Sequence, residues 1–208
     1  MKDNNAWENL KQMKKRPPKE FLAYLWEYYR KPALIVIFLL AVAASVITEI
    51  SKQKQPQLNM LILNVVAAPQ ENDFWLDFSQ SSGIQTQDVC ANASMRFDDT
   101  LSEDTILTKQ YVVTHTASGE LDAVIGNQAV FDEYADTLFA DLRTVLPSEL
   151  MQKLHDRLVY QNSVPIGISL SDCEKFKTAY YYEDCIFGIC RNCFHSVNAV
   201  LFLQYLFS

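Results

Sequence analysis

The chain has 208 residues, a net charge of −7 and a hydrophobic content of 49%, which excludes an intrinsically disordered polypeptide. Residues 1–32 hold eight basic and four acidic side chains, a net charge of +4, so the remainder carries −11. An acidic region of this kind lacks the basic surface that nucleic acid requires, and we expect no nucleic-acid partner.

One apolar run has the character of a membrane segment. Residues 33–48 contain no charged side chain, and as a helix they would extend roughly 24 Å, near the thickness of a bilayer core. Trp26, Tyr28 and Tyr29 precede the run, as in an interfacial aromatic belt, and the basic residues lie on the same side. We therefore predict a transmembrane helix at 33–50, single-pass in the cell membrane, with a cytoplasmic N-terminus.

Other interpretations of the N-terminal region stay open. The apolar run could be a buried core helix, or a cleaved signal peptide with Ala41-Val42-Ala43 as its cleavage site. A preceding basic region of about 30 residues is longer than a signal peptide usually has, which favours an uncleaved anchor. Residues 18–31 have apolar side chains at helical spacing, which predicts an amphipathic helix at the inner membrane surface or against a partner.

The remaining chain divides into a polar linker at 51–57 and one domain at 58–208. This domain alternates short apolar runs with amphipathic segments. Strands are predicted at 58–66, 93–97, 121–126, 164–170 and 186–189, and helices at 71–80, 128–137, 150–158 and 195–207. Residues 105–116 fit a helix or a strand, because their centre is β-branched.

The alternation of strands and helices predicts an α/β fold with helices on both faces of a sheet. The run at 121–125 is short and mostly apolar, which is typical of a central strand buried on both faces. Its one charged residue, Asp122, should find a hydrogen bond, because an unpaired buried charge is costly.

Four phrases of the domain resemble bacterial extracellular solute-binding proteins of the periplasmic-binding type. They lie at 118–127 (SGELDAVIGN), 131–142 (FDEY…FADL), 164–168 (VPIGI) and 188–206 (GICRN…NAVLFLQYL). The layout of basic tail, span and outer domain is similar to that of single-span membrane proteins of Gram-positive bacteria. The resemblance implies a single extracytoplasmic α/β lobe, half of the two-lobed fold, and it does not carry over the transport role.

Ligands of such sheets contact loops at the carboxyl ends of strands. On this basis we select Asn64, Asn127, Gln128 and Asn192 as candidate ligand-binding residues. The predicted function is a membrane-anchored binding module for a small molecule, without catalytic residues, metal or cofactor, and not an enzyme. The alternative is a structural or assembly subunit that docks another cell-envelope protein.

Cys190 and Cys193 form a C-x-x-C motif ahead of the last predicted helix. A helix N-terminus lowers a thiol pKa, so a thiol-redox enzyme is a further, less favoured alternative. Cys185 and His195 could complete a zinc site, but zinc sites usually show two paired clusters. We expect incidental or disulfide-forming cysteines, and five cysteines beyond the span leave at least one free or intermolecular.

Overall fold

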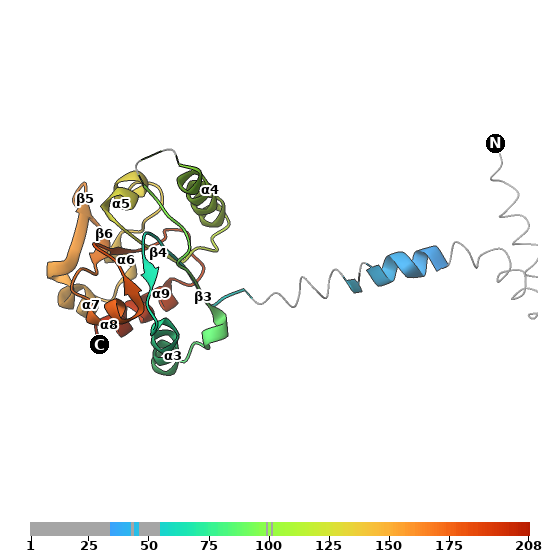
Figure 1. Cartoon of the computed structure of the whole chain (residues 1–208), viewed down its shortest axis with the longest axis horizontal. Helices are drawn as coiled ribbons and strands as arrows, with labels where there is room; N and C mark the ends of the chain where they lie inside the picture. Colours follow the sequence, from blue (N-terminus) through green and yellow to red (C-terminus); the bar gives the residue numbers. More distant parts are fainter. Residues whose placement is uncertain (1–33, 43, 46–54, 99, 101) are drawn as a thin grey trace, which may run out of the picture. The chain divides into compact units, whose positions relative to one another are not determined.

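The structure is a computed structural model that describes residues 34–42, 44–45, 55–98, 100 and 102–208. The chain divides into two units, Met1–Lys54 and Gln55–Ser208. The described residues of the predicted span, 34–42 and 44–45, are helical (Figure 1). Within the described ranges, no helix combines the length and the apolar character that crossing a bilayer requires. The predicted tail and the start of the linker lie outside the described residues.

The second unit contains a mixed six-stranded sheet in the order β3-β1-β4-β8-β6-β5. Its strands are β1 (Leu58–Ile62), β3 (Val89–Asn92), β4 (Ala123–Gly126), β5 (Leu158–Gln161), β6 (Val164–Ser169) and β8 (Ile186–Ile189). β1 is parallel to β3 and to β4, whereas β8 is antiparallel to both β4 and β6. A separate antiparallel ribbon joins β2 (Val66–Ala67) and β7 (Tyr180–Tyr181). The predicted α/β fold is confirmed.

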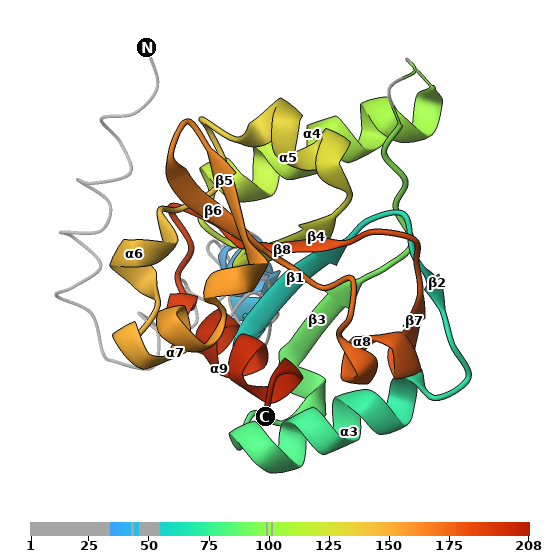
Figure 2. The ribbon, with the colours of Figure 1, turned by 90° about the vertical axis from the view of Figure 1, so that its left-hand side faces the viewer.

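Helices cover both faces of the sheet. They are α3 (Glu71–Ser82), α4 (Glu103–Ala117), α5 (Gln128–Tyr134), α6 (Leu142–Val145), α7 (Ser148–Lys153), α8 (Glu174–Ala179) and α9 (Ser196–Leu206). Figure 2 shows α4 and α5 on one side of the sheet and α3, α8 and α9 on the other. Successive side chains of a strand point to opposite faces, so Met60 packs in the core with Phe202 of α9, and Leu61 packs with Phe131 of α5.

β4 lies between β1 and β8, as the predicted central strand should. Val124 and Ile125 are fully buried, one in each of the two hydrophobic cores. Regular pairing begins at Ala123, and Leu121 and Asp122 enter the sheet as buried residues just before it. The strand therefore places its two ends, Asp122 and Asn127, at opposite edges of the sheet.

Two local predictions are wrong, and one open alternative is decided by the structure. The second strand is β3 rather than 93–97, because residues 89–92 take the pairing positions beside β1. The ambiguous segment 105–116 is helical, since the Ser102 hydroxyl accepts a hydrogen bond from the Thr105 N–H (3.2 Å) and caps α4. The predicted helix 150–158 ends early, because Leu158 begins a β-hairpin whose turn residues, Asn162 and Ser163, have positive φ.

Candidate functional site

A pocket of about 660 Å³ lies at the carboxyl ends of β1 and β4. Three chain segments line it: a residue two positions after β1, the start of α5, and the end of β7 with the turn that leads to β8. The lining residues are Asn64, Asn127, Gln128, Ala129, Tyr181, Tyr182, Glu183 and Asp184. The volume is within the range of small-molecule sites. Three of the four candidate residues chosen from the sequence thus come together here.

Asn64 lines the pocket, and both ends of its side-chain amide make hydrogen bonds within the protein. It has a left-handed backbone (φ 59°), a conformation that asparagine tolerates better than most residues. Its Nδ2 donates to the carbonyl oxygen of Phe97 (2.6 Å), and its Oδ1 accepts from the Phe97 N–H (2.9 Å). Because both ends of the amide hold the backbone of Phe97, whose side chain is buried in the same core as Leu61 of β1, we assign Asn64 a positioning role.

Asn127 and Gln128 keep polar atoms available for a ligand. The Asn127 Oδ1 accepts a long hydrogen bond from the Val130 N–H (3.4 Å) and caps α5. Gln128 is exposed, and its Nε2 donates to the Asp132 Oδ1 (2.7 Å). These bonds use the amide oxygen of Asn127 and the amide nitrogen of Gln128. The Asn127 Nδ2 and the Gln128 Oε1 are therefore the groups that a ligand could engage.

The opposite wall was missed by sequence reasoning. Tyr181 is 60% exposed, and its backbone is fixed where β7 pairs with Val66 of β2. The Tyr182 hydroxyl donates to the Leu170 carbonyl (2.7 Å), and the Ser171 hydroxyl donates to the Asp184 Oδ1 (3.3 Å). Burial raises the pKa of Tyr182, which keeps its hydroxyl a donor. The sequence does contain a signal for this wall of the pocket, because three tyrosines are followed by two acidic residues at 180–184.

Asn192 does not join the other candidates. Since β8 runs antiparallel to β4, its carboxyl end lies at the opposite edge of the sheet. There Asn192 lines a smaller pocket of about 240 Å³, together with residues of α4, the last residue of α5 and the segment after it. The rule that placed loops at carboxyl ends assumes parallel strands, and the orientation of β8 was not visible in the sequence.

The C-x-x-C turn lies beside a buried carboxylate at this second edge, since the Cys190 N–H donates to the Asp122 carbonyl (2.9 Å). Asp122 has no exposed surface. Its Oδ2 accepts from the Asn59 N–H (2.8 Å), and its Oδ1 accepts from the His195 N–H (2.9 Å). The predicted hydrogen bonding of Asp122 is confirmed, and it joins β1 and β4 to the start of α9. Burial raises the pKa of Asp122, although these two N–H groups and His195 act in the opposite direction.

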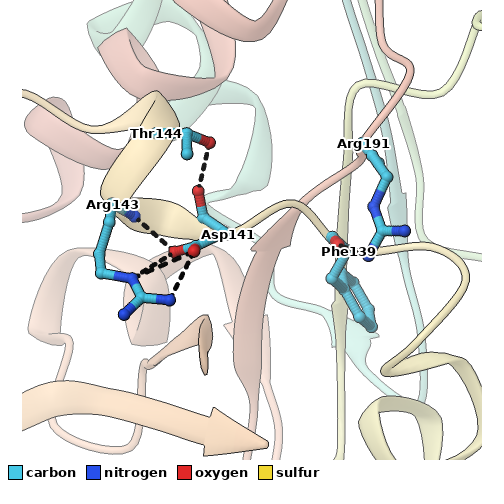
Figure 3. A network of polar contacts seen from close by, with 5 residues as sticks. All are labelled: Phe139, Asp141, Arg143, Thr144 and Arg191. Carbon is cyan, nitrogen blue, oxygen red and sulfur yellow. Dashed lines mark hydrogen bonds and ion pairs between the residues drawn. The ribbon is translucent and has the colours of Figure 1, made fainter. Parts of the chain in front are cut away.

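The same turn is held against residues 138–139. The backbone N–H of Arg191 donates to the Leu138 carbonyl (2.8 Å), and its Nη2 donates to the Phe139 carbonyl (3.2 Å). Figure 3 shows that Arg191 reaches Phe139, whereas the nearby Asp141 pairs with Arg143 (2.7 Å). This pairing lowers the pKa of Asp141. The turn is therefore closed by internal hydrogen bonds.

The thiols of the turn lack the properties of a redox pair. Cys190 is 2% exposed, and burial raises its pKa well above the usual value. Burial also raises the pKa of Cys193 to about 11. A nucleophilic thiol needs the opposite shift, because the thiolate is the reactive form. Among the described residues, no group of three or more His, Cys, Asp or Glu side chains is placed to hold a metal ion.

Comparisons with protein-family models, with curated proteins and with solved structures give no match to this chain. The resemblance to solute-binding proteins therefore stays a prediction, and the pockets at the two edges of the sheet are the observations that bear on function.

Proposed function

We propose that the chain is a membrane-anchored binding module, whose pocket at the carboxyl ends of β1 and β4 takes a small polar ligand. One observation carries the proposal: side chains from three separate segments converge on a cavity of about 660 Å³. Several of their polar atoms are not used in holding the fold. A pocket with a few convergent polar groups is the usual form of a small-molecule site.

The lining favours binding over catalysis. The eight lining residues in the described part of the chain include no serine, cysteine, histidine or lysine, so they form none of the usual pairs of a nucleophile and a nitrogen base. The functional groups are amides, phenols and carboxylates, which recognise a ligand by hydrogen bonds and charge. This is the chemistry of a receptor for a solute, as the resemblance to a solute-binding lobe implies.

The anchoring is part of the proposal. The uncharged run at 33–48 and the basic excess before it support a span at 33–50, with the pocket-bearing unit outside the cell. A peptide tag placed after Met1 tests the orientation. We expect it to resist protease added to intact cells, and its removal under those conditions would contradict the proposed topology.

A pair of tryptophan substitutions tests the binding site. Ala129 lines the large pocket and Ala117 lines the small one, so Ala129→Trp and Ala117→Trp each fill one pocket with the same side chain. The full chain, in mild detergent, is screened by thermal shift against sugars, amino acids, amines and carboxylates. We expect a ligand whose stabilisation is lost in Ala129→Trp and kept in Ala117→Trp. The reverse pattern, or no ligand in any class, would contradict the proposal.

A second candidate function, docking of another cell-envelope protein, is favoured by apolar side chains at the other edge. Val113, Phe194 and Val197 are 63%, 61% and 70% exposed, and Val113 lines the small apolar pocket. The double variant Val113→Glu, Phe194→Glu should leave ligand binding unchanged under the first proposal. If docking is the function, it should abolish recovery of a cross-linked envelope partner from intact cells.

A further inference from the structure

We infer that the ligand of the large pocket is a small organic cation, a protonated amine or a quaternary ammonium; this inference rests on the proposed function. Among the described residues, the charged residues of the lining are Glu183 and Asp184, and the lining contains no lysine, arginine or histidine. A ligand with a positive charge would gain Coulomb energy from both carboxylates, whereas an anion would be repelled.

The nearby lysines do not neutralise these carboxylates. α8 precedes the acidic turn and carries Lys175 and Lys177. The Nζ of Lys175 donates to the Tyr205 carbonyl (2.9 Å) and lies over the Tyr205 ring, 4.6 Å from its centroid. The Nζ of Lys177 pairs with Glu174 (3.3 Å). Both ammonium groups are engaged on α8 and α9, so the negative charge of the pocket is left for the ligand.

The tyrosines of the same wall favour an organic cation in particular. Tyr181 is 60% exposed beside Glu183 and Asp184, and Tyr182 also lines the pocket. Aromatic faces attract ammonium groups through the ring quadrupole and also cover their carbon substituents. A bare metal ion would require more oxygen ligands, because calcium takes six to eight. The pocket supplies two carboxylates, and its volume leaves room for a carbon skeleton.

The test compares matched ligands that differ in charge. Calorimetric titration of the full chain uses choline and putrescine, together with their uncharged isosteres, in which carbon or hydroxyl replaces the nitrogen. A neutral sugar and a dicarboxylate complete the panel. We expect at least one of the two cations to bind, and its isostere to bind at least about tenfold more weakly, since about 1.4 kcal/mol corresponds to tenfold in affinity.

Two substitutions with matched controls locate the binding. Glu183→Gln should weaken cation binding about fivefold, and Tyr181→Ala should weaken it about two- to fivefold. Glu149→Gln on α7 removes the same charge outside the pocket, and Tyr160→Ala on β5 removes a tyrosine that is 52% exposed. Both controls should bind like the unchanged chain.

The outcomes separate this inference from the proposed function. If the sugar or the dicarboxylate binds, and Ala129→Trp abolishes that binding while neither cation binds, the pocket is a binding site and the cation inference is overturned. Equal binding of a cation and its isostere would also overturn it. If no compound of the panel binds at millimolar concentration, the cation inference is overturned, and the wider thermal-shift screen decides the proposed function.

Discussion

The polar residues at the two ends of β4 have different roles: one holds the fold together, and the other lines a pocket. At the amino end, Asp122 is fully buried and its carboxylate accepts backbone hydrogen bonds from β1 and from the start of α9. At the carboxyl end, Asn127 caps a short helix and its remaining polar atoms face a pocket. The Cys190–Cys193 turn belongs to the first environment, and the acidic turn with Glu183 belongs to the second.

This difference shows that a sequence motif alone does not identify the functional site. The C-x-x-C turn has the residues of a redox or zinc site, but its backbone is paired with residues 138–139, Cys190 is buried and Cys193 is half-buried. The 181–184 segment carries no known motif, yet it leaves two carboxylates and a tyrosine ring accessible. Exposure and unused hydrogen-bonding capacity identify the better candidate site.

The largest loss of stability is expected for a substitution within β4 itself. Val124 is fully buried and pairs with Leu61 on β1 and with Gly188 on β8. Val124→Asp would place a charge in the core without a partner, which should cost more than about 4 kcal/mol and abolish cooperative unfolding. A variant with the denaturant midpoint of the unchanged chain would show that β4 is not central.

A matched pair of alanine substitutions compares the two ends directly. Asp122→Ala leaves the N–H groups of Asn59 and His195 without their acceptor, which should lower the free energy of unfolding by about 2–3 kcal/mol. Asn127→Ala removes one long capping bond and should cost about 0.5–1 kcal/mol. Urea unfolding measures both changes, and equal losses would contradict the contrast between the two ends.

The pH dependence of thiol alkylation tests the amino end further. Burial raises the pKa of Cys193 to about 11. Because the thiolate is the reactive form, its fraction rises tenfold per pH unit below the pKa. The alkylation rate of Cys193 in the reduced protein should therefore rise about a hundredfold from about pH 8 to pH 10. A rate that is already level near pH 8 would indicate an activated thiol and revive the redox alternative.

The smallest change in stability is expected for a substitution on the outer face of α5. Asp132 is exposed, and its interaction with Gln128 is a surface contact (2.7 Å). Asp132→Ala should change the free energy of unfolding by no more than about 0.5 kcal/mol. A loss above about 1 kcal/mol in thermal or urea unfolding would mean that the start of α5 depends on this pair more than its exposure suggests.

The sequence was informative where burial alone determines the local structure. The central strand, the helix at α3 with its end at Gly83 (φ 77°), and the final helix were all predicted close to their observed bounds. In each case, a run of apolar residues marks the element, and for the strand and α3 a glycine marks its end. The strand that ends at Gly126 also predicted Asn127 and Gln128 as pocket residues, because a loop must follow a buried strand.

The parts that failed depend on pairing between distant segments. β3 has only four residues, none of them fully buried, and its place beside β1 is set by hydrogen bonds rather than by its own pattern. The antiparallel direction of β8 separated Asn192 from the other candidates. The acidic wall at 181–184 reaches the pocket through the β2–β7 ribbon, whose two-residue strands are too short to show a periodicity.

Hydrogen exchange of the full chain, with and without the ligand that binds most tightly in the calorimetric panel, locates the binding site. We expect slower exchange of backbone amides in 127–134 and 180–184, at the carboxyl end of β4, with no change in 190–195. Ligand-induced protection confined to 190–195 or to α4 would place the site at the other edge of the sheet and contradict the proposed function.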